Sequence, residues 1–395
     1  MANSELLKNF DKAVDRRKSC CIKWDRGPAA LDPNIIPMWI ADTDFESPRE
    51  VSEAIIRRCA HPVFGYGFPP AALTEGFINW FKERHDIEIS RDWIQVGTGV
   101  VTAISYSVQA FTQPGDKVLI QTPVYDPFKA VISGTGRQPV ESRLLPKDGR
   151  WCMDFEDLER RFAEGVKMIV LCNPHNPVGS VWTREELRAL ADLCRKYNVY
   201  ITSDEIHCDF GLFGHRYTSM LSFPQVRHLT VCCTAPGKTF NISGLAISLT
   251  VVPDETLREK LSTAFRSAWL INPNLLGLEA AAAAYTHGAD WHDAQLEYLE
   301  ENSRLVKSRL EKEAPHIRPA VHEGTFMMWL DFSDFKLSNE ALEEEIVHKW
   351  HIRMNSGWHY GPGGDGFMRM NIGTRRELIN TALDRLADMH RAYFK

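Results

Sequence analysis

The 395-residue chain lacks the features that mark membrane, secreted and nucleic-acid-binding proteins. No apolar run approaches the length of a membrane span, and the N-terminal MANSELLKNFDKAVDRRKSC contains no apolar stretch typical of a signal peptide. A basic surface for nucleic acid or anionic lipid is also missing, because the formal net charge is −6. The sequence therefore predicts a cytoplasmic globular protein with neither a nucleic-acid nor a membrane partner.

Signs of disulfides and of metal ligands are equally scarce. The nine cysteines are odd in number and include no C-x-x-C pair, and a chain of this length does not need disulfides for stability. The fourteen histidines never form H-E-x-x-H or another metal-ligand spacing. We expect reduced thiols and no metal site.

A nucleotide-binding P-loop is excluded as well. The only Gly-Lys-Thr lies in TAPGKTFNISG, residues 234–244. A P-loop has the pattern G-x-x-x-x-G-K-[ST], but the position of its first glycine is occupied by Cys232. Pro236 also removes one of the backbone amides that would bind the phosphates. Lys238 must therefore have another role.

The region from about residue 90 to 255 alternates short apolar runs with amphipathic helices. The clearest helix, TREELRALADLCRKYN, begins with a capping box of Thr183 and Glu186. Apolar strands separated by helices indicate an α/β fold whose mostly parallel sheet is covered on both faces. The strands are expected at 117–121, 167–172, 199–203, 229–233 and 246–252.

The remaining segments predict a second domain. GLEAAAAAY, residues 277–285, is typical of a buried helix, and long charged helices with strands TFMMWLDF and FMRMNIG follow it. We expect an N-terminal segment at 1–48, a large domain at 49–285 and a smaller C-terminal α/β domain at 286–395. The turn-rich PMWIADTDF is expected at the junction of the two domains.

Polar side chains follow three successive predicted strands. Asn176, Asp204 and Lys238 come after the strands at 167–172, 199–203 and 229–233. Ligands of open α/β sheets bind outside the carboxyl ends of the strands, so these side chains should share one site. A lysine that forms an imine, a carboxylate for a pyridine nitrogen and an amide for a phenolic oxygen together suit pyridoxal phosphate.

The motifs resemble those of a known family. NPHNPVG, SDEIH and APGKTFNISGL are similar to the signature segments of fold-type I pyridoxal phosphate enzymes, the class I/II aminotransferase superfamily. PMWIADTDF, FGYG and KTFNISGL most resemble its branch of cystathionine β-lyase-like C–S lyases, and the resemblance runs through nearly the whole chain. It implies a large domain with a mostly parallel seven-stranded sheet between helices, a smaller α/β domain and a homodimer.

The resemblance also implies roles for individual residues. Lys238 would carry pyridoxal phosphate and shuttle protons, and Asp204 would pair with the ring nitrogen. Arg369 would bind the substrate α-carboxylate, a bidentate task suited to arginine. Tyr66 would reach the phosphate of the neighbouring subunit. The other implied cofactor contacts are Asn176, His207, Tyr125, Gly99, Val100 and Val101, and Trp39 and Ala41 would line the substrate pocket.

Some positions depart from the family pattern, and others can be explained by packing alone. Gly237 stands where relatives usually have serine, and Ala246 where many aminotransferases have arginine, so two phosphate contacts are missing. Thr234 is expected to compensate in part. His207 is equally well explained as a packing histidine, and the sequence does not decide whether Trp358 and Tyr360 cover the substrate or pack in the core.

Three functions follow from this site. The leading hypothesis is a C–S lyase that converts a sulfur-containing amino acid into a thiol, pyruvate and ammonia by α,β-elimination. The alternative is an aminotransferase, which uses the same residues. A regulator that has lost catalysis is a third hypothesis, but it predicts loss of Lys238 or Asp204, and both are present.

Overall fold

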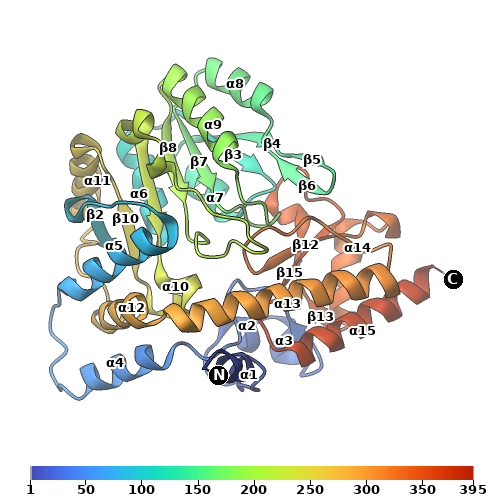
Figure 1. Ribbon diagram of the computed structural model, residues 1–395. Coiled ribbons are helices and arrows are strands. Elements are labelled where there is room, and N and C mark those ends of the chain that lie inside the picture. The colour runs from blue at the N-terminus through green and yellow to red at the C-terminus, as the bar shows by residue number, and fades with distance from the viewer. Residues whose placement is uncertain (1, 395) are drawn as a thin grey trace.

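A seven-stranded sheet forms the centre of the larger part of the protein in the computed structural model, which describes residues 2–394 (Figure 1). The strand order is β2-β10-β9-β8-β7-β3-β4. Only β10 runs antiparallel to its neighbours, so the prediction of a mostly parallel sheet is confirmed. The strands are β2 (Ile94–Gly97), β3 (Lys117–Thr122), β4 (Gln138–Arg143), β7 (Met168–Cys172), β8 (Tyr200–Asp204), β9 (Thr230–Thr234) and β10 (Ser248–Val251).

Five of these strands match the expected ones, and the two missed strands lie at the sheet edges. The sequences of β2 and β4, IQVG and QPVESR, are only partly buried. An edge strand needs no continuous apolar run, and a proline is tolerated there because one side of the strand has no partner. The pattern used to find the central strands therefore does not detect them.

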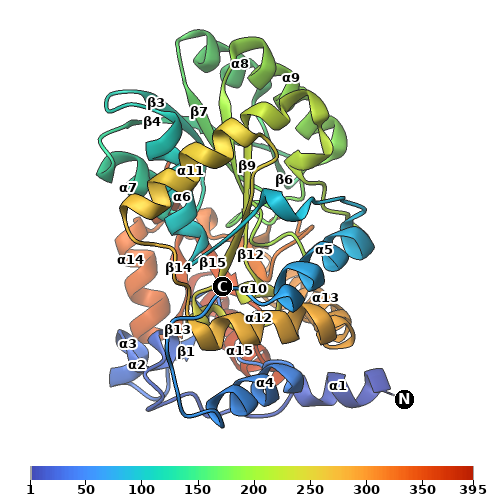
Figure 2. The same ribbon diagram turned by 90° about the vertical axis from the view of Figure 1, so that its left-hand side faces the viewer.

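Helices cover both faces of this sheet, and each face has its own core. Val118 and Ile120 of β3 belong to one core, whereas Leu119 belongs to the other, because successive side chains of a strand point to opposite faces. Figure 2 shows α6 and α11 on one face and α8 and α9 on the other. The helices of this part are α4 (Arg49–Cys59), α5 (Ala71–His85), α6 (Val100–Phe111), α7 (Pro127–Gly134), α8 (Phe155–Ala163), α9 (Arg184–Tyr197), α10 (Pro236–Thr239), α11 (Glu255–Ser267) and α12 (Leu275–His287).

Local sequence signals explain where two of these helices form. The Thr183 hydroxyl accepts a hydrogen bond from the Glu186 amide at 3.1 Å, and the Glu186 carboxylate accepts one from the Thr183 amide at 2.8 Å. The predicted capping box at the start of α9 is therefore confirmed. The alanine-rich helix α12 is buried along most of its length, as its composition predicts.

A second, four-stranded sheet lies in the C-terminal part of the chain. Its order is β11-β12-β15-β14, and all its strands pair antiparallel. The long helix α13 runs from α12 to this sheet (Figure 1). The domain boundaries at residues 48 and 285 stay a prediction. The elements are α13 (Ala289–Glu313), β11 (Arg318–Pro319), β12 (Met327–Asp331), α14 (Asn339–Glu344), β14 (Asn355–Ser356), β15 (Phe367–Asn371) and α15 (Arg376–Tyr393), and a hairpin of β5 (Leu145–Lys147) and β6 (Arg150–Cys152) precedes α8.

The N-terminal segment connects the two parts. It contains α1 (Ala2–Phe10), α2 (Ile22–Asp25) and α3 (Pro28–Leu31), and β1 (Ile36–Pro37) pairs in parallel with β13 (Ile352–Arg353). Asn371 at the end of β15 donates to the carbonyls of Ile40 and Asp42 at 2.6 and 2.7 Å. Asn241, just after α10, donates to the carbonyls of Thr43 and Phe45 at 3.1 and 2.7 Å. Residues 40–45 thus contact both the end of β15 in the four-stranded sheet and the segment after α10 beside the seven-stranded sheet.

All nine cysteines are free, and burial raises the pKa of the Cys172 and Cys194 thiols. Within residues 2–394, every helix is too short or too polar to span a lipid bilayer.

Candidate active site

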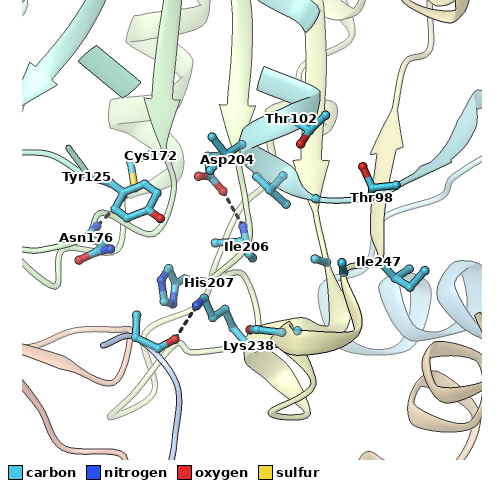
Figure 3. Close-up of a pocket in the computed structure, with 18 residues that line it drawn as sticks. Thr98, Thr102, Tyr125, Cys172, Asn176, Asp204, Ile206, His207, Lys238 and Ile247 are labelled. Carbon is cyan, nitrogen blue, oxygen red and sulfur yellow. Dashed lines mark hydrogen bonds between the residues drawn. The ribbon is translucent and has the colours of Figure 1, made fainter. Parts of the chain in front are cut away.

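A cavity of about 310 Å³ opens at the carboxyl ends of the central strands (Figure 3). Asn176 follows β7, Asp204 is the last residue of β8 and Lys238 follows β9, and all three line this cavity. Parallel neighbouring strands end at the same edge of the sheet, which explains why residues 28 and 34 positions apart in the sequence converge. The structure therefore brings the three residues together as the sequence predicts.

Lys238 lies on the short helix α10 and is buried. Its ammonium group donates a hydrogen bond to the carbonyl of Ala41. Burial, helped by the nearby charge of Arg369, lowers the pKa of Lys238 to about 8, against the opposing effect of Asp42 and Asp204. Since an amine is nucleophilic only when it is deprotonated, this pKa gives Lys238 a reactive fraction near neutral pH that an exposed lysine does not have.

Asp204 is the last residue of β8 and faces the same cavity. One carboxylate oxygen accepts a hydrogen bond from the Ile206 amide at 3.1 Å. Burial raises the pKa of Asp204 to about 7, although the Ile206 hydrogen bond and the positive charge of Lys238 favour ionisation. A cationic ligand beside this carboxylate would lower its pKa again, because it would add an opposite charge to that of Lys238.

Arg369 projects from β15 behind the cavity wall. Its guanidinium donates to the side-chain oxygen of Asn176 at 3.0 Å and to the carbonyl of Trp39 at 2.6 Å. Its Nε is buried and has no hydrogen-bond partner among residues 2–394. The Tyr360 ring lies 5.2 Å from the guanidinium carbon, so Tyr360 packs on this side chain, while Trp358 is partly exposed. Arg369 is thus held in place while its Nε–H stays without a partner.

Tyr125 and His207 complete the cavity wall around Asn176 and Asp204. Burial and the Asp204 charge raise the pKa of Tyr125 to about 12, which keeps its phenol neutral. Burial and the charges of Lys238 and Arg369 lower the pKa of His207 well below its usual value. The His207 Nδ1 is buried without a partner in the described chain, although the ring also packs edge-on against Phe326. His207 therefore both lines the cavity and packs in the core.

Comparison with known proteins identifies the family. The model of the family described as aminotransferase class I and II matches residues 33–386. The chain belongs to this family.

Its relatives include both lyases and aminotransferases. Cystathionine beta-lyase PatB of Bacillus subtilis is 38% identical over 96% of this chain and 98% of its own length. Among solved structures, a PLP-bound putative aminotransferase from Clostridium difficile is 37% identical with a TM-score of 0.92, covering 96% of this chain and 98% of its own. Cystalysin from Treponema denticola, whose structure contains pyridoxal 5'-phosphate, is 34% identical with a TM-score of 0.93, covering 97% and 98%.

The end of the cavity at helix α6 is suited to an anion. Thr98, Val100, Val101 and Thr102 line it, and the first amides of a helix lack partners within the helix. Gly99 differs from the expectation, because its amide donates to the Ser248 hydroxyl at 3.0 Å. Gly99 thus lines the cavity while its amide is already used, and Val100 and Val101 are the better candidates for the anion.

Ser243 is a cavity residue that the sequence did not single out. A Cβ added to Gly237 would lie 3.0 Å from the Ser243 hydroxyl and 3.1 Å from its Cα, so glycine leaves the room that Ser243 needs. The Ser243 side chain lines the cavity, and its hydroxyl makes no hydrogen bond within residues 2–394. The signal in the sequence that could have identified Ser243 is its position in the motif KTFNISG, five residues after Lys238.

Three expected site residues lie elsewhere in the subunit. The Thr234 hydroxyl donates to the Glu205 carbonyl at 3.2 Å, and Thr234 is not among the described residues that line the cavity. Trp39 contributes its carbonyl to Arg369 and donates its indole N–H to the Lys23 carbonyl at 3.1 Å, whereas Ala41 does line the cavity. Tyr66 is 94% exposed, which leaves it free to contact another molecule.

Proposed function

We propose that the protein is a cytoplasmic, pyridoxal phosphate-dependent C–S β-lyase that acts on cysteine derivatives substituted at sulfur. The observation that carries the proposal is one buried cavity in which an amine of lowered pKa, Lys238, faces a buried carboxylate, Asp204. The full-length similarity to cystathionine beta-lyase PatB selects elimination among the reactions of this family. The products are a thiol, pyruvate and ammonia.

The residues present fit this cofactor. Lys238 would hold it covalently, Asp204 would pair with its ring nitrogen, and the Tyr125 ring would stack on it. The unpartnered Nδ1 of His207 and the side-chain amide of Asn176 are polar groups that would be available to its phenolic oxygen. Val100, Val101 and Ser243 offer donors for its phosphate.

Each of these residues has a defined task in the elimination. When bound, pyridoxal phosphate withdraws electrons from the α-carbon of the substrate. Lys238 removes the α-proton, which its lowered pKa permits near neutral pH. Asp204 stays ionised beside the ring nitrogen, and Arg369 binds the substrate α-carboxylate in exchange for the Trp39 carbonyl.

Two assays separate elimination from amino transfer. Purified protein is mixed with L-cystathionine in one, and with an amino acid and 2-oxoglutarate in the other. Release of pyruvate in the first assay, without glutamate in the second, is the expected result. Glutamate formation without pyruvate would identify an aminotransferase instead. Failure of both reactions in protein that binds pyridoxal phosphate would support the regulator hypothesis.

Ser243 provides a test of the phosphate contacts. Ser243→Ala is expected to weaken pyridoxal phosphate binding roughly tenfold or more, because a charged acceptor loses a hydrogen bond and none of the described residues that line the cavity is an arginine. Gly237→Ala should weaken binding as well, because its new Cβ would meet Ser243 at 3.0–3.1 Å. Absorbance titration of the apoprotein measures both affinities. Ser308→Ala, on the exposed side of α13, is the control, and unchanged affinity in Ser243→Ala would contradict the role.

We also propose that the protein is a homodimer in which each subunit completes the other's site. The loop between α4 and α5, on the outer edge of the molecule in Figure 1, exposes Phe64, Tyr66 and Phe68, which are 59%, 94% and 82% accessible. Aromatic side chains gathered on a surface usually mark a contact with another molecule. A dimer with two-fold symmetry would bury this loop twice and present both tyrosines to the opposite sites.

Tyr66→Phe tests this arrangement because it removes a single oxygen. The dimer should persist, while pyridoxal phosphate binding is expected to weaken about tenfold or more, since the phosphate loses a hydrogen bond. Sedimentation gives the oligomeric state, and absorbance titration gives the affinity. Tyr197→Phe, a tyrosine of α9 away from the cavity, is the control. A fully active monomer, or wild-type affinity in Tyr66→Phe, would show that one subunit holds a complete site.

A further inference from the structure

The helix that carries Lys238 is too short to hold its own position. α10 spans Pro236–Thr239, a single turn, and one turn of helix is not stable by itself in water. Only Lys238 and Thr239 have polar side chains in it. The Lys238 ammonium donates to the Ala41 carbonyl, and the Thr239 hydroxyl donates to a carboxylate oxygen of Asp209 at 2.6 Å. Because the amine must be free to react, Thr239 is the side chain that can anchor the helix.

Asp209, the partner of Thr239, is a buried and ionised carboxylate. Its second oxygen accepts hydrogen bonds from the Trp80 indole N–H and from Nε2 of His85, both residues of α5, at 2.8 Å each. Burial opposes ionisation, but the hydrogen bond and charge of His85, with the charge of His292 and the Thr239 hydrogen bond, hold the pKa of Asp209 well below its ordinary value. Hydrogen bonds to an ionised acceptor are stronger than neutral ones. Asp209 therefore ties α10 firmly to α5.

The surroundings of Asp209 are packed against the end of α10. Its carbonyl accepts a hydrogen bond from Nε2 of His292 on α13 at 2.9 Å. Phe240, the residue after α10, is fully buried, and its ring meets the Trp80 ring edge-on with the centroids 5.1 Å apart. The Trp80 and His292 rings also touch, with centroids 5.8 Å apart. Asp209 is thus held in a fixed position from which it can hold α10.

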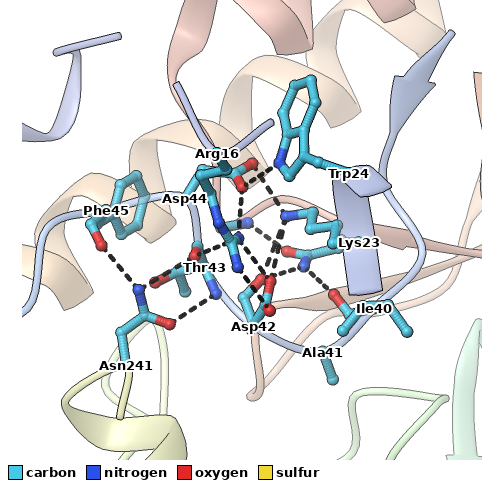
Figure 4. Close-up of polar contacts among 12 residues, drawn as sticks. Arg16, Lys23, Trp24, Ile40, Ala41, Asp42, Thr43, Asp44, Phe45 and Asn241 are labelled. Atoms are coloured by element: carbon cyan, nitrogen blue, oxygen red, sulfur yellow. Dashed lines mark hydrogen bonds and ion pairs between the residues drawn. The ribbon is translucent and has the colours of Figure 1, made fainter. Parts of the chain in front are cut away.

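A separate set of contacts holds the chain just after α10 (Figure 4). The side-chain amide of Asn241 donates to the carbonyls of Thr43 and Phe45, and its oxygen accepts a hydrogen bond from the Thr43 amide at 3.2 Å. These partners lie in the same irregular segment as Ala41. Asn241 therefore fixes the chain after α10 to the N-terminal segment, whereas Asp209 fixes α10 to α5 in the larger part of the protein.

From this geometry we infer that Asp209 is a positioning residue for the elimination, because its carboxylate, through Thr239, keeps the Lys238 amine aligned with the substrate α-carbon. The inference rests on the proposed lyase function. In the step concerned, the proton moves to the Lys238 nitrogen and the electron pair of the broken bond stays with the carbon. Asp209 is not among the described residues that line the cavity, so it acts through α10 and does not touch the substrate. A misplacement of about 1 Å can cost on the order of 10²-fold in rate.

Thr239→Val tests the anchor because it keeps the shape of the side chain and removes the donor. In the holoenzyme, kcat for pyruvate release from L-cystathionine should fall about ten- to a hundredfold, while KM changes little. The isotope effect on kcat with α-deuterated L-cystathionine should rise, because proton removal becomes slower than the other steps. Simple loss of folded enzyme would lower kcat without raising the isotope effect. Thr239→Ser keeps the hydroxyl and should restore both values. A folded Thr239→Val enzyme with wild-type kcat and isotope effect would overturn the inference.

A second readout does not depend on elimination. The rate at which Lys238 of the apoprotein attaches pyridoxal phosphate is followed by absorbance, and Thr239→Val and Asp209→Asn should each lower it about tenfold or more, because the same amine must be aligned. Thr230→Val is the matched control. Thr230 is buried at the other end of β9, donates to the Val226 carbonyl at 2.8 Å, and should leave this rate and kcat unchanged.

Thermal unfolding checks that each variant is folded, and Thr239→Val decides the outcome if Asp209→Asn does not fold. A wild-type attachment rate in folded Thr239→Val would contradict the positioning role. Slowed attachment in the variants, together with absence of pyruvate from the wild type, would refute the lyase function and still assign the alignment of Lys238 to Asp209.

Discussion

Lys238→Ala is expected to lower kcat about 10⁴-fold or more, the upper end of the range for the loss of a positioned acid or base. The variant would lose the proposed covalent attachment of the cofactor, together with the only amine that lines the cavity in the described chain. Cofactor held by Asp204, Tyr125 and the phosphate contacts should still bind, because none of these residues depends on Lys238 for its position. Steady-state release of pyruvate from L-cystathionine measures the loss.

A control variant and a chemical rescue accompany this experiment. Lys260→Ala, on the exposed face of α11, should keep wild-type kinetics. A small primary amine added to Lys238→Ala should restore part of the rate, because it can take up the proton that Lys238 would have removed. A Lys238→Ala enzyme that retains more than a tenth of wild-type kcat would assign the reaction to another base.

Asp204→Asn is expected to lower kcat on the order of 10² or more, since a charge-stabilising contact in a water-excluded site contributes on this scale to the rate. Asparagine keeps the shape of the side chain and removes only its charge. Burial raises the pKa of Asp204 to about 7 even though the nearby charge of Lys238 favours the ionised form. Pairing with a protonated ring nitrogen would favour the ionised form.

The outcome of Asp204→Asn is distinguished from misfolding by spectroscopy and by a matched variant. Bound cofactor should remain visible in the absorption spectrum of Asp204→Asn, because the substitution leaves Lys238, the proposed point of covalent attachment, unchanged. Asp192→Asn, on the exposed face of α9, should behave as the wild type. Near-normal kcat in Asp204→Asn would mean that another group pairs with the ring nitrogen.

The central sheet and the first residues of the site could be predicted because they follow one simple rule. Buried parallel strands read as continuous apolar runs, and polar residues directly after them must meet at one edge of the sheet. Asn176, Asp204 and Lys238 lie at the ends of three such apolar strands or just after them, and they do line one cavity. The edge strands β2 and β4 could not be predicted by this rule. One side of each is unpaired and their side chains are only partly buried, so neither has a continuous apolar run.

The rest of the site depends on contacts that have no local signal. Ser243 reaches the cavity because the chain turns after α10 and brings its Cα against Gly237, and no periodic pattern encodes that turn. Thr234 is the last residue of β9, as Asp204 is of β8, yet its hydroxyl donates to the Glu205 carbonyl. The hydrogen bond between Asp209 and α10 spans 30 residues of the sequence. Such contacts are decided by tertiary packing and only the folded chain reveals them.

One measurement tests most directly whether Lys238 is the centre of this chemistry. Active holoenzyme is reduced with borohydride, digested, and its peptides are analysed by mass spectrometry. A single pyridoxyl-modified lysine, Lys238 in the peptide that contains GKTFNISG, is the predicted result. Modification of a different lysine, or an active enzyme in which no lysine is modified, would contradict the account.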